Sequence, residues 1–493
     1  METKEQSLVK NSVYNVAYKL LNVFFPLISS VYISHILLAE GVGRVAYAQN
    51  IVTYFTTLAA LGLPNYGVRE IAKIHLDFLK TQKTFSELFI VNTISTLVCG
   101  GLYYLIIFFV PRFNNDLLLY FVVGLPIIFN FINVDWFFQG EEEYGYIAFR
   151  SFIIKVVSLI ALFLFVRNKN DVVIYALILS LATCGNYIFN IFRLRKYKIK
   201  LQLKNIDIMQ HIKPVIIMLG TTLAIELYTL LDTTMIGIFC SDVYVGYYTN
   251  TMKLVKVIIT VITAIGSTLL PRLSYYHMIG ENLKCEKIVN YVFAIMLFLF
   301  IPCQIGMIIC SDAIIPILFG NSFLPAVNTF KIASFLICTL GFSNLFGTQI
   351  LLTFGEEKKL FVCTILGAIT NIILNSFLIP MYQQNGAAFA SVISEAVVTI
   401  TTYILAKRYI KIRLSRKFVN SIFCSAFIMI LVLVGIKFLL RNMICIYMLV
   451  SIIIGCIIYF GCNWGLKNEI LEDIISFSLN KWRKYQNRKG VGK

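Results

Sequence analysis

Long apolar segments alternate with short polar ones along almost the whole chain. A helix needs about 20 apolar residues to cross the hydrocarbon layer of a membrane. With that length as a ruler, the pattern predicts fourteen spans, at about 13–34, 44–64, 85–110, 117–138, 147–166, 172–192, 213–238, 246–270, 289–310, 327–352, 360–380, 386–406, 418–440 and 443–463. Strands of a membrane barrel would instead alternate over about ten residues. The sequence therefore predicts an all-α integral membrane protein.

Composition supports this interpretation. Of the 493 residues, 58% are hydrophobic and 14% are charged, whereas soluble domains carry roughly a quarter charged residues. These values exclude a string of soluble domains. The N-terminal run METKEQSLVKNS has no short apolar core followed by a small-residue cleavage site, so we expect the first apolar segment to remain as a span.

The sequence offers no chemistry typical of an enzyme. The twelve cysteines include no C-x-x-C pair and the four histidines are scattered, which argues against a metal site or a disulfide framework. There is no Walker A loop, G-x-S-x-G element or H-E-x-x-H helix. We therefore expect neither catalysis nor a cofactor.

Basic residues are distributed unevenly between the two ends of the predicted spans. Segments on the same side as the N-terminus carry 32 Lys and Arg, the opposite side carries 5, and 6 lie within spans. Cytoplasmic loops carry the excess of basic residues, so both termini are predicted to be cytoplasmic. This asymmetry accounts for most of the net charge of +18, so nucleic-acid binding is not needed to explain that charge. Basic runs such as 193–200 are topology signals first and contacts for anionic membrane lipids second.

A weak internal repeat divides the spans into two sets of six. Gly140-Glu141-Glu142 follows the fourth span and Gly355-Glu356-Glu357 follows the tenth, while Tyr47-Ala48-Gln49 and Tyr248-Thr249-Asn250 stand early in the second and eighth. Both matches fall six spans apart. The repeat predicts two pseudo-symmetric six-helix lobes, 1–205 and 206–410, followed by two extra spans within 411–463. Parallel repeats of this kind place a substrate cavity between the halves.

The last part of the chain, 464–493, predicts a cytoplasmic tail of a different kind. Apolar residues from Ile470 to Trp482 are interleaved with acids and then followed by a basic cluster. This pattern is typical of an amphipathic helix on the membrane surface. The alternative is a frayed polar tail.

Ionisable residues within the spans are the candidate functional residues, because burying charge in a membrane is expensive. The candidates for a substrate cavity are Lys19, Arg150, Glu226, Asp232, Lys253 and Lys256, together with the polar neighbours Asn15 and Tyr18. Two interpretations stay open. The charges pair between helices, for example Asp232 with Lys253 or Lys19, or they line a cavity that binds an anionic substrate such as a diphosphate. Arg150, Lys155 and Lys331 could alternatively snorkel to an interface.

Several runs resemble the Wzx-type polysaccharide repeat-unit flippases. They occur in order along nearly the whole chain: 11–26 (NSVYNVAYKLLNVFFP), 66–73 (YGVREIAK), 135–140 (DWFFQG) with Glu142, 231–237 (LDTTMIG), 246–250 (GYYTN), 270–272 (LPR) and 318–320 (LFG). The chain is thus similar to the oligosaccharidyl-lipid branch of the superfamily that also holds multidrug and toxic compound extrusion transporters and lipid II flippases. One departure is His35, where many relatives have Arg in Pro-Tyr-x-Ser-Arg, so an imidazole stands where those relatives have a permanent positive charge.

The resemblance implies a V-shaped bundle that works by alternating access in the inner (cytoplasmic) membrane. Its cargo would be undecaprenyl diphosphate carrying an oligosaccharide unit, moved from the cytoplasmic to the outer leaflet for O-antigen or capsule biosynthesis. Glycan polymerase and other polysaccharide-assembly proteins would be its partners. The alternatives are a lipid II flippase and a cation-coupled multidrug antiporter of the same superfamily. A membrane-embedded glycan polymerase is disfavoured because the largest outward segment, about 311–326, is short.

Overall fold

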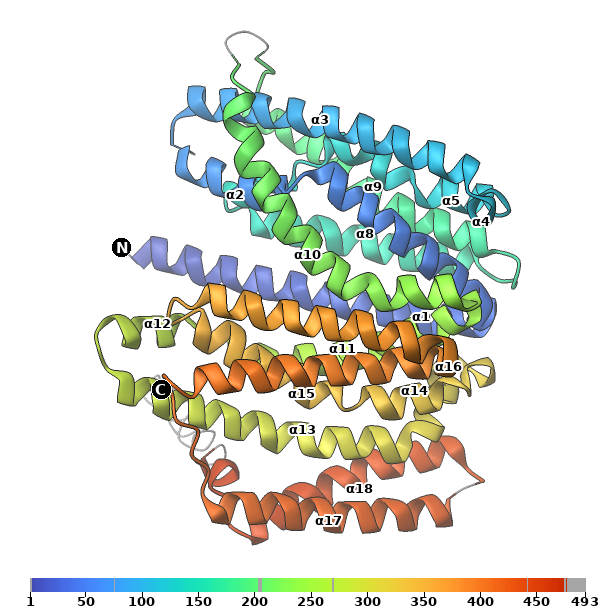
Figure 1. Ribbon diagram of the computed structural model, residues 1–493, viewed down its shortest axis with the longest axis vertical. Coiled ribbons are helices and arrows are strands. Elements are labelled where there is room, and N and C mark those ends of the chain that lie inside the picture. Colours follow the sequence, from blue (N-terminus) through green and yellow to red (C-terminus); the bar gives the residue numbers. More distant parts are fainter. Residues whose placement is uncertain are drawn as a thin grey trace, which may run out of the picture. The chain divides into compact units, whose positions relative to one another are not determined.

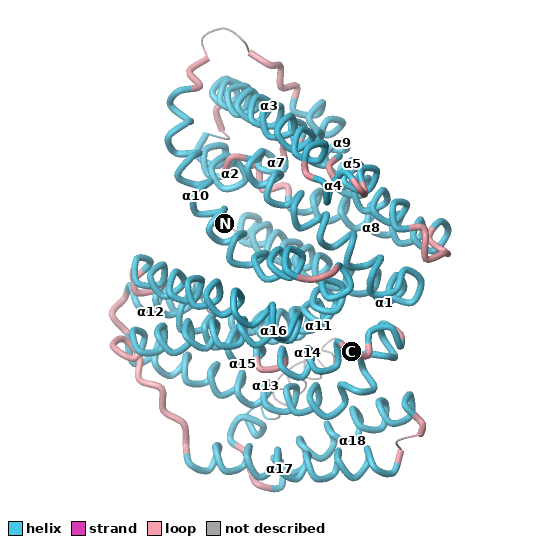
Figure 2. Tube along the Cα trace, turned by 45° about the vertical axis from the view of Figure 1, so that its right-hand side comes forward, coloured by secondary structure: helices cyan, strands magenta, loops and turns pink. Residues whose placement is uncertain are grey.

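The computed structural model describes residues 2–74, 76–202, 206–267, 270–440, 442–473 and 476, with side chains described from Asn22 onward except for 264–271. Within these residues every regular element is a helix (Figure 2). Ten helical segments of this part of the chain are long and apolar enough to cross a membrane. The all-α membrane class is confirmed, and the count of fourteen spans stays a prediction.

The chain folds into two compact units, Met1–Asn250 and Thr251–Lys493. The first unit consists of α1 (Glu2–Ala60), α2 (Leu63–Ile74), α3 (Phe78–Phe109), α4 (Pro111–Asn114), α5 (Leu117–Val123), α6 (Leu125–Ile128), η1 (Phe129–Ile132), α7 (Asp135–Gly140), α8 (Tyr144–Phe165), α9 (Val172–Tyr197), α10 (Met209–Phe239) and the start of α11 (Asp242–Ser267) (Figure 1).

The second unit continues along α11. It then contains α12 (Leu270–Met278), α13 (Asn282–Phe319), η2 (Asn321–Phe323), α14 (Ala326–Ala333), α15 (Leu336–Ser343), a π-helix η3 (Asn344–Leu351), α16 (Glu357–Ala406), α17 (Arg416–Leu439) and α18 (Ile444–Gly465). Side-chain caps set the starts of two helices, α3 in the first unit and α17 in the second. Asp77 and Ser415 accept hydrogen bonds from the first-turn amides of Lys80 and Phe418, which caps α3 and α17.

Two long helices, α1 and α16, each hold two of the predicted spans. Each is broken at a single non-helical residue with a positive φ, Leu38 with φ 58° in α1 and Gln383 with φ 49° in α16. In α16 the two halves pack against each other, and Asn371 Nδ2 of the first half donates a hydrogen bond to Ser394 Oγ of the second half at 3.4 Å. The ribbon turns sharply where α16 is broken (Figure 1). These breaks stand where the hydropathy pattern ends one span and begins the next.

The predicted lobe boundary after 205 differs from the boundary between the compact units, which falls within α11 after Asn250. The lobes therefore stay a prediction of the repeat. In the described part of the tail, Ile470 and Leu471 are buried in the apolar core of the second unit, together with residues of α13, α17 and α18. Most of the predicted amphipathic tail, 474–493 except 476, lies outside the described residues.

Two of the runs that resemble the flippase family form one packing contact in the first unit. Trp136, Phe137 and Phe138 of α7 are buried against α2 and α3. A Cβ on Gly67 would lie 2.7 Å from Trp136 Cε3, and one on Gly140 would lie 2.7 Å from Ile71 Cβ. Only glycine permits this approach of α2 and α7, so these runs maintain the fold at this place.

Large apolar side chains cover the outside of both units. Phe109 is 80% exposed, and many other Leu, Ile and Phe residues on α3, α8, α17 and α18 are also exposed. Soluble monomers rarely carry apolar surface on this scale. Such a surface is stable when lipid chains cover it.

Candidate functional site

A polar hollow of about 330 Å³ lies in the first unit, between the second half of α1 and α9. Gln49, Thr53 and Thr56 stand on one face of α1, spaced four and three residues apart. Opposite them stand polar residues of α9, and apolar residues complete the wall: Ser180, Thr183, Tyr187, Val52, Val123, Pro126 and Leu179. The hollow therefore combines hydroxyl and amide groups with apolar surface.

The threonine hydroxyls of this hollow are oriented by their own helices. Thr53 Oγ1 donates to the Gln49 carbonyl at 2.8 Å, and Thr56 Oγ1 donates to the Thr53 carbonyl at 3.0 Å. On α9, Thr183 Oγ1 donates to the Leu179 carbonyl at 3.2 Å. A hydroxyl that donates to its helix keeps its lone pairs as acceptors. Such a surface can accept hydrogen bonds from the hydroxyl groups of a sugar.

A second polar stripe on α1 attaches this helix to α10. Asn50 Nδ2 donates to Thr234 Oγ1 at 2.6 Å, and the hydroxyls of Tyr54 and Thr234 are 2.8 Å apart. Gln49, Thr53, Thr56 and their partners were not among the candidates from the sequence. The helical spacing of these polar residues could have indicated them, but hydroxyls in apolar helices change hydropathy too little to stand out.

Arg150 of α8 is 4% exposed and lies in a network of polar groups. Its guanidinium donates to both carboxylate oxygens of Asp135 at 3.0 and 3.1 Å, and to Asn186 at 3.1 Å. It also donates to Asn190 Oδ1, while Asn190 Nδ2 donates to Asp135 at 2.7 Å. The network joins α7, α8 and α9. Because α9 also forms one wall of the hollow, the network fixes that wall.

Asp232 and Glu226 lie about 1.7 turns apart on α10. Asp232 is buried, and the hydroxyl of Tyr248 on α11 donates to its carboxylate. Glu226 is half-buried. Lys253 is half-buried and Lys256 is exposed, and both lie on the part of α11 that belongs to the second unit. The pairing of Asp232 with Lys253 or Lys19 therefore stays a prediction.

Three further candidates, Asn15, Tyr18 and Lys19, lie on the first half of α1. Their side chains lie outside the described residues. The structure thus brings Arg150 together with Asp135, a residue that the sequence also places at the end of the fourth span. The cavity that the sequence predicted around all eight candidates stays a prediction.

Ion pairs connect other elements of the first unit near helix ends. Arg112 of α4 donates to the Gly237 carbonyl of α10 and to Asp242 of α11 at 2.8 Å, while Arg44 and Asp116 are 2.6 Å apart. Near the start of α10, Glu87 and Tyr66 hold the two ring nitrogens of His211 at 2.9 and 2.8 Å. These contacts fix the helices that carry the polar groups.

A family match and several similar proteins agree on the family of this chain. A sequence family described as "Polysaccharide biosynthesis protein" matches residues 8–277. The chain is 23% identical over 415 residues to a protein of Escherichia coli (strain K12) named "Putative O-antigen transporter", with 81% of this chain and 96% of that one covered. It is 26% identical over 240 residues to "Probable low-salt glycan biosynthesis flippase Agl15" of Haloferax volcanii, with 48% of each chain covered.

A solved structure also matches, that of the lipid II flippase MurJ in an inward closed conformation. The TM-score is 0.71 at 17% sequence identity, with 94% of this chain and 100% of that chain covered. At this identity the likeness shows a shared fold.

Proposed function

The chain belongs to the polysaccharide biosynthesis protein family, and we propose that it is a flippase for a lipid-linked oligosaccharide repeat unit. The cargo is an oligosaccharide on undecaprenyl diphosphate, which the protein moves from the cytoplasmic to the outer leaflet by alternating access. The product serves the assembly of a surface polysaccharide such as O-antigen or capsule. The observation that carries this proposal is the family match over residues 8–277.

The chemistry of the first unit supports a sugar cargo. The hollow between α1 and α9 offers acceptor oxygens from Thr53, Thr56 and Thr183 and an amide from Gln49. Carbohydrate hydroxyls need such partners when water is removed, because each unpaired polar group is costly to bury. The apolar residues of the same hollow fit the carbon faces of a sugar ring.

The cations within the spans support a diphosphate at the reducing end of that cargo. Lys19, Lys253 and Lys256 are point charges that can meet phosphate without a fixed geometry. We propose that they contact the diphosphate, with Asp232, Glu226, Tyr18 and Asn15 as polar residues of the same cavity. The guanidinium of Arg150 already donates hydrogen bonds to Asp135, Asn186 and Asn190. A direct role for Arg150 would require this network to open, so we expect it to orient α9.

Deletion of the gene in the source organism tests the proposal. We expect surface glycan to disappear while lipid-linked repeat units accumulate inside the cell, and the wild-type gene to restore the glycan. Normal surface glycan in the deletion strain would overturn the proposal. Single repeat units at the surface would also overturn it, because they are the product of a strain that lacks only polymerisation.

Complementation with variants tests the proposed diphosphate contact. Lys253→Ala should fail to restore surface glycan although the protein is inserted at wild-type levels, because a cation within the membrane is lost. Lys358→Ala removes an exposed lysine near the start of α16 and should complement fully. Equal complementation by both variants would remove Lys253 from the site.

The shared fold with the lipid II flippase favours one alternative, transport of the lipid-linked peptidoglycan precursor. In cells that build peptidoglycan and have no second lipid II flippase, such a transporter is indispensable. A viable deletion strain with normal cell-wall synthesis would therefore exclude this alternative.

A further inference from the structure

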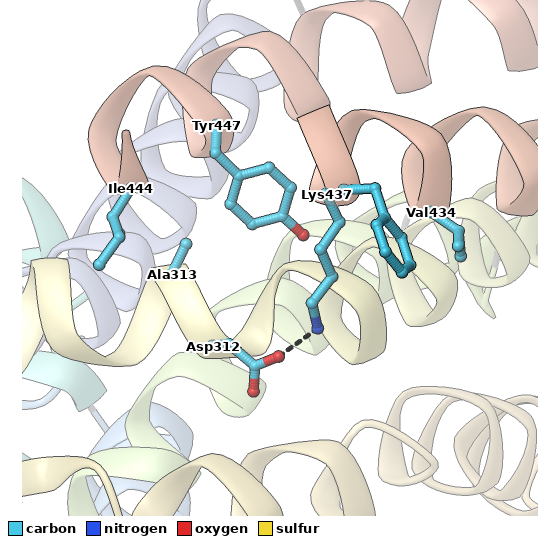
Figure 3. Close-up of a pocket in the computed structure, with 7 residues that line it drawn as sticks. Asp312, Ala313, Val434, Lys437, Ile444 and Tyr447 are labelled. Carbon is cyan, nitrogen blue, oxygen red and sulfur yellow. Dashed lines mark hydrogen bonds and ion pairs between the residues drawn. The ribbon is translucent and has the colours of Figure 1, made fainter. Parts of the chain in front are cut away.

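A cluster of three charged side chains lies in the second unit, where α13, α14 and α17 meet. Asp312 of α13 binds the ammonium of Lys331 on α14 at 3.0 Å and the ammonium of Lys437 on α17. Figure 3 shows the carboxylate of Asp312 at the tip of the Lys437 side chain. One carboxylate thus serves two ammonium groups, which leaves a net charge of about +1.

The cluster borders a hollow of about 480 Å³ between α13, α17 and α18. Apart from Asp312 and Lys437, its wall consists of Tyr447 and apolar residues: Ala313, Val434, Phe438 and Ile444. The hydroxyl of Tyr447 is held by the Ile309 carbonyl at 2.9 Å. The hollow therefore has one charged wall and otherwise apolar walls (Figure 3).

The ammonium groups retain capacity for a further anion. Each ammonium has three N–H donors, and Asp312 takes one from each. The Lys437 side chain is 41% exposed, so its donors reach the hollow.

The depth of the cluster matches the headgroup region of a membrane. Lys437 follows Arg416, the first residue of α17, by a rise of about 32 Å along the helix. The hydrocarbon layer is about 30 Å thick. Beside Lys437, Phe438 is 85% and Leu439 is 84% exposed, and such surface is stable against lipid chains. The charge thus lies where a phosphate would be, with apolar surface next to it.

We propose that Asp312, Lys331, Lys437 and the adjoining hollow form a binding site for the phosphate of an anionic phospholipid. Its acyl chains run along Val434, Phe438 and Ile444. A phosphodiester carries one negative charge, which matches the net charge of the cluster. A polyprenyl diphosphate carries more charge and would need more cations than the cluster provides. This phospholipid site is therefore separate from the site that binds the cargo of the proposed function. An experiment can refute either proposal without refuting the other.

The purified full-length protein in detergent tests this site by native mass spectrometry. The probes are phosphatidylglycerol and phosphatidylcholine with identical acyl chains, which differ in net charge but share the phosphodiester. We expect wild type to retain phosphatidylglycerol over phosphatidylcholine. Lys437→Gln should reduce phosphatidylglycerol occupancy roughly tenfold, the loss typical of a hydrogen-bonded charged contact. Lys437→Arg should retain it, and Lys358→Gln, the control at an exposed lysine, should bind as wild type.

Asp312→Asn separates this site from an ion pair that only joins helices. It raises the net charge of the cluster, so phosphatidylglycerol should bind at least as tightly as in wild type. Loss of binding in a folded Asp312→Asn protein would overturn the proposal. So would equal occupancy in wild type and Lys437→Gln, or undecaprenyl diphosphate displacing phosphatidylglycerol at equal concentration. If Lys437→Gln does not fold, Lys331→Gln gives the same comparison.

Discussion

Arg150 illustrates what a single residue does inside the membrane-spanning part of the first unit. Its side chain is 3% exposed and its partner Asp135 is 24% exposed, with two hydrogen bonds between them. Two asparagines of α9 complete the arrangement. Removing one member of a buried ion pair leaves the other charge buried without a partner, which is strongly destabilising. Replacing both members with apolar residues leaves no buried charge and costs much less stability. The network therefore predicts a strong coupling between the two residues.

Arg150→Met should lower the free energy of unfolding by about 3 kcal/mol, because Asp135 remains ionised beside a buried apolar side chain. The double variant Arg150→Met with Asp135→Leu should lose less than the single variant. Equilibrium unfolding of the purified proteins in mixed micelles measures both. Additive losses in the double variant would show that the two residues do not interact.

Residue-scale prediction from the sequence succeeded in part. Arg150 stood out because ionised groups are rare within spans, whereas its partner Asp135 was not among the candidates for the substrate cavity and appeared as the first residue of a run that resembles the flippase family. Asn186 and Asn190 as their partners could not be read from the sequence, because the rotation of a helix about its axis is set by packing against its neighbours. For the same reason the wall formed by Gln49, Thr53 and Thr56 was missed.

Helices α1 and α11 approach each other backbone to backbone. A Cβ on Gly43 would lie 1.7 Å from the Asp242 carbonyl oxygen, and one on Gly246 would lie 2.1 Å from the Ala39 carbonyl oxygen. Close approach at small residues is a common basis of helix association in membranes. The sequence showed Gly246 only within a run that resembles a family. Its partner Gly43 has no sequence signal, because the contact joins positions about 200 residues apart.

Gly246→Ala should destabilise the fold by about 3 kcal/mol or more, since a backbone carbonyl cannot move aside as a side chain can. Gly220→Ala on α10 is the matched control, because a Cβ there would meet no atom within 4 Å. We expect Gly220→Ala to keep the wild-type melting temperature. A similar melting temperature for both variants would mean that α1 and α11 do not pack in this way.

The turn between α7 and α8 is attached to the end of α9 by Glu143. Its carboxylate accepts two hydrogen bonds from Arg193, at 2.9 and 3.0 Å. Burial raises the pKa of Glu143, but the hydrogen bonds from Arg193 and Tyr197 and the nearby positive charges outweigh it and hold the pKa below its ordinary 4.5. A lowered pKa means that the folded state favours the ionised form. The stabilisation is therefore complete above pH 4.5 and is lost as the pH falls through the lowered pKa.

Glu143→Gln should be less stable than wild type at pH 7 by about 1 kcal/mol, a value reduced by solvent screening. The difference should shrink as the pH falls below 4.5, because wild type then protonates Glu143. Melting temperatures of wild type and Glu143→Gln between pH 7 and pH 3 measure this difference in stability. A constant difference over that range would show that Glu143 is not the group that titrates.

For the whole molecule, the distribution of charge predicts the orientation in the membrane. The sides of the predicted spans carry 32 and 5 basic residues. Hydropathy and charge sufficed to predict the all-α membrane class, because both are sums over many residues and tolerate local errors. The division into units could not be predicted in the same way, since the contacts divide the chain within α11, which has no polar break at that point.

Reporter fusions test the orientation. A fluorescent protein fused after Lys493 should fluoresce, because it folds in the cytoplasm. Alkaline phosphatase fused between α17 and α18 should be active, because it folds only outside. Activity of alkaline phosphatase at the C-terminus, with a dark fluorescent fusion, would reverse the predicted topology.

The breaks at Leu38 and Gln383 turn α1 and α16 at one residue each, without a loop between the halves. On the proposed topology both breaks face the exterior. Neither break leaves a loop on that side, so a protease added there has almost no exposed backbone to cut at these two places.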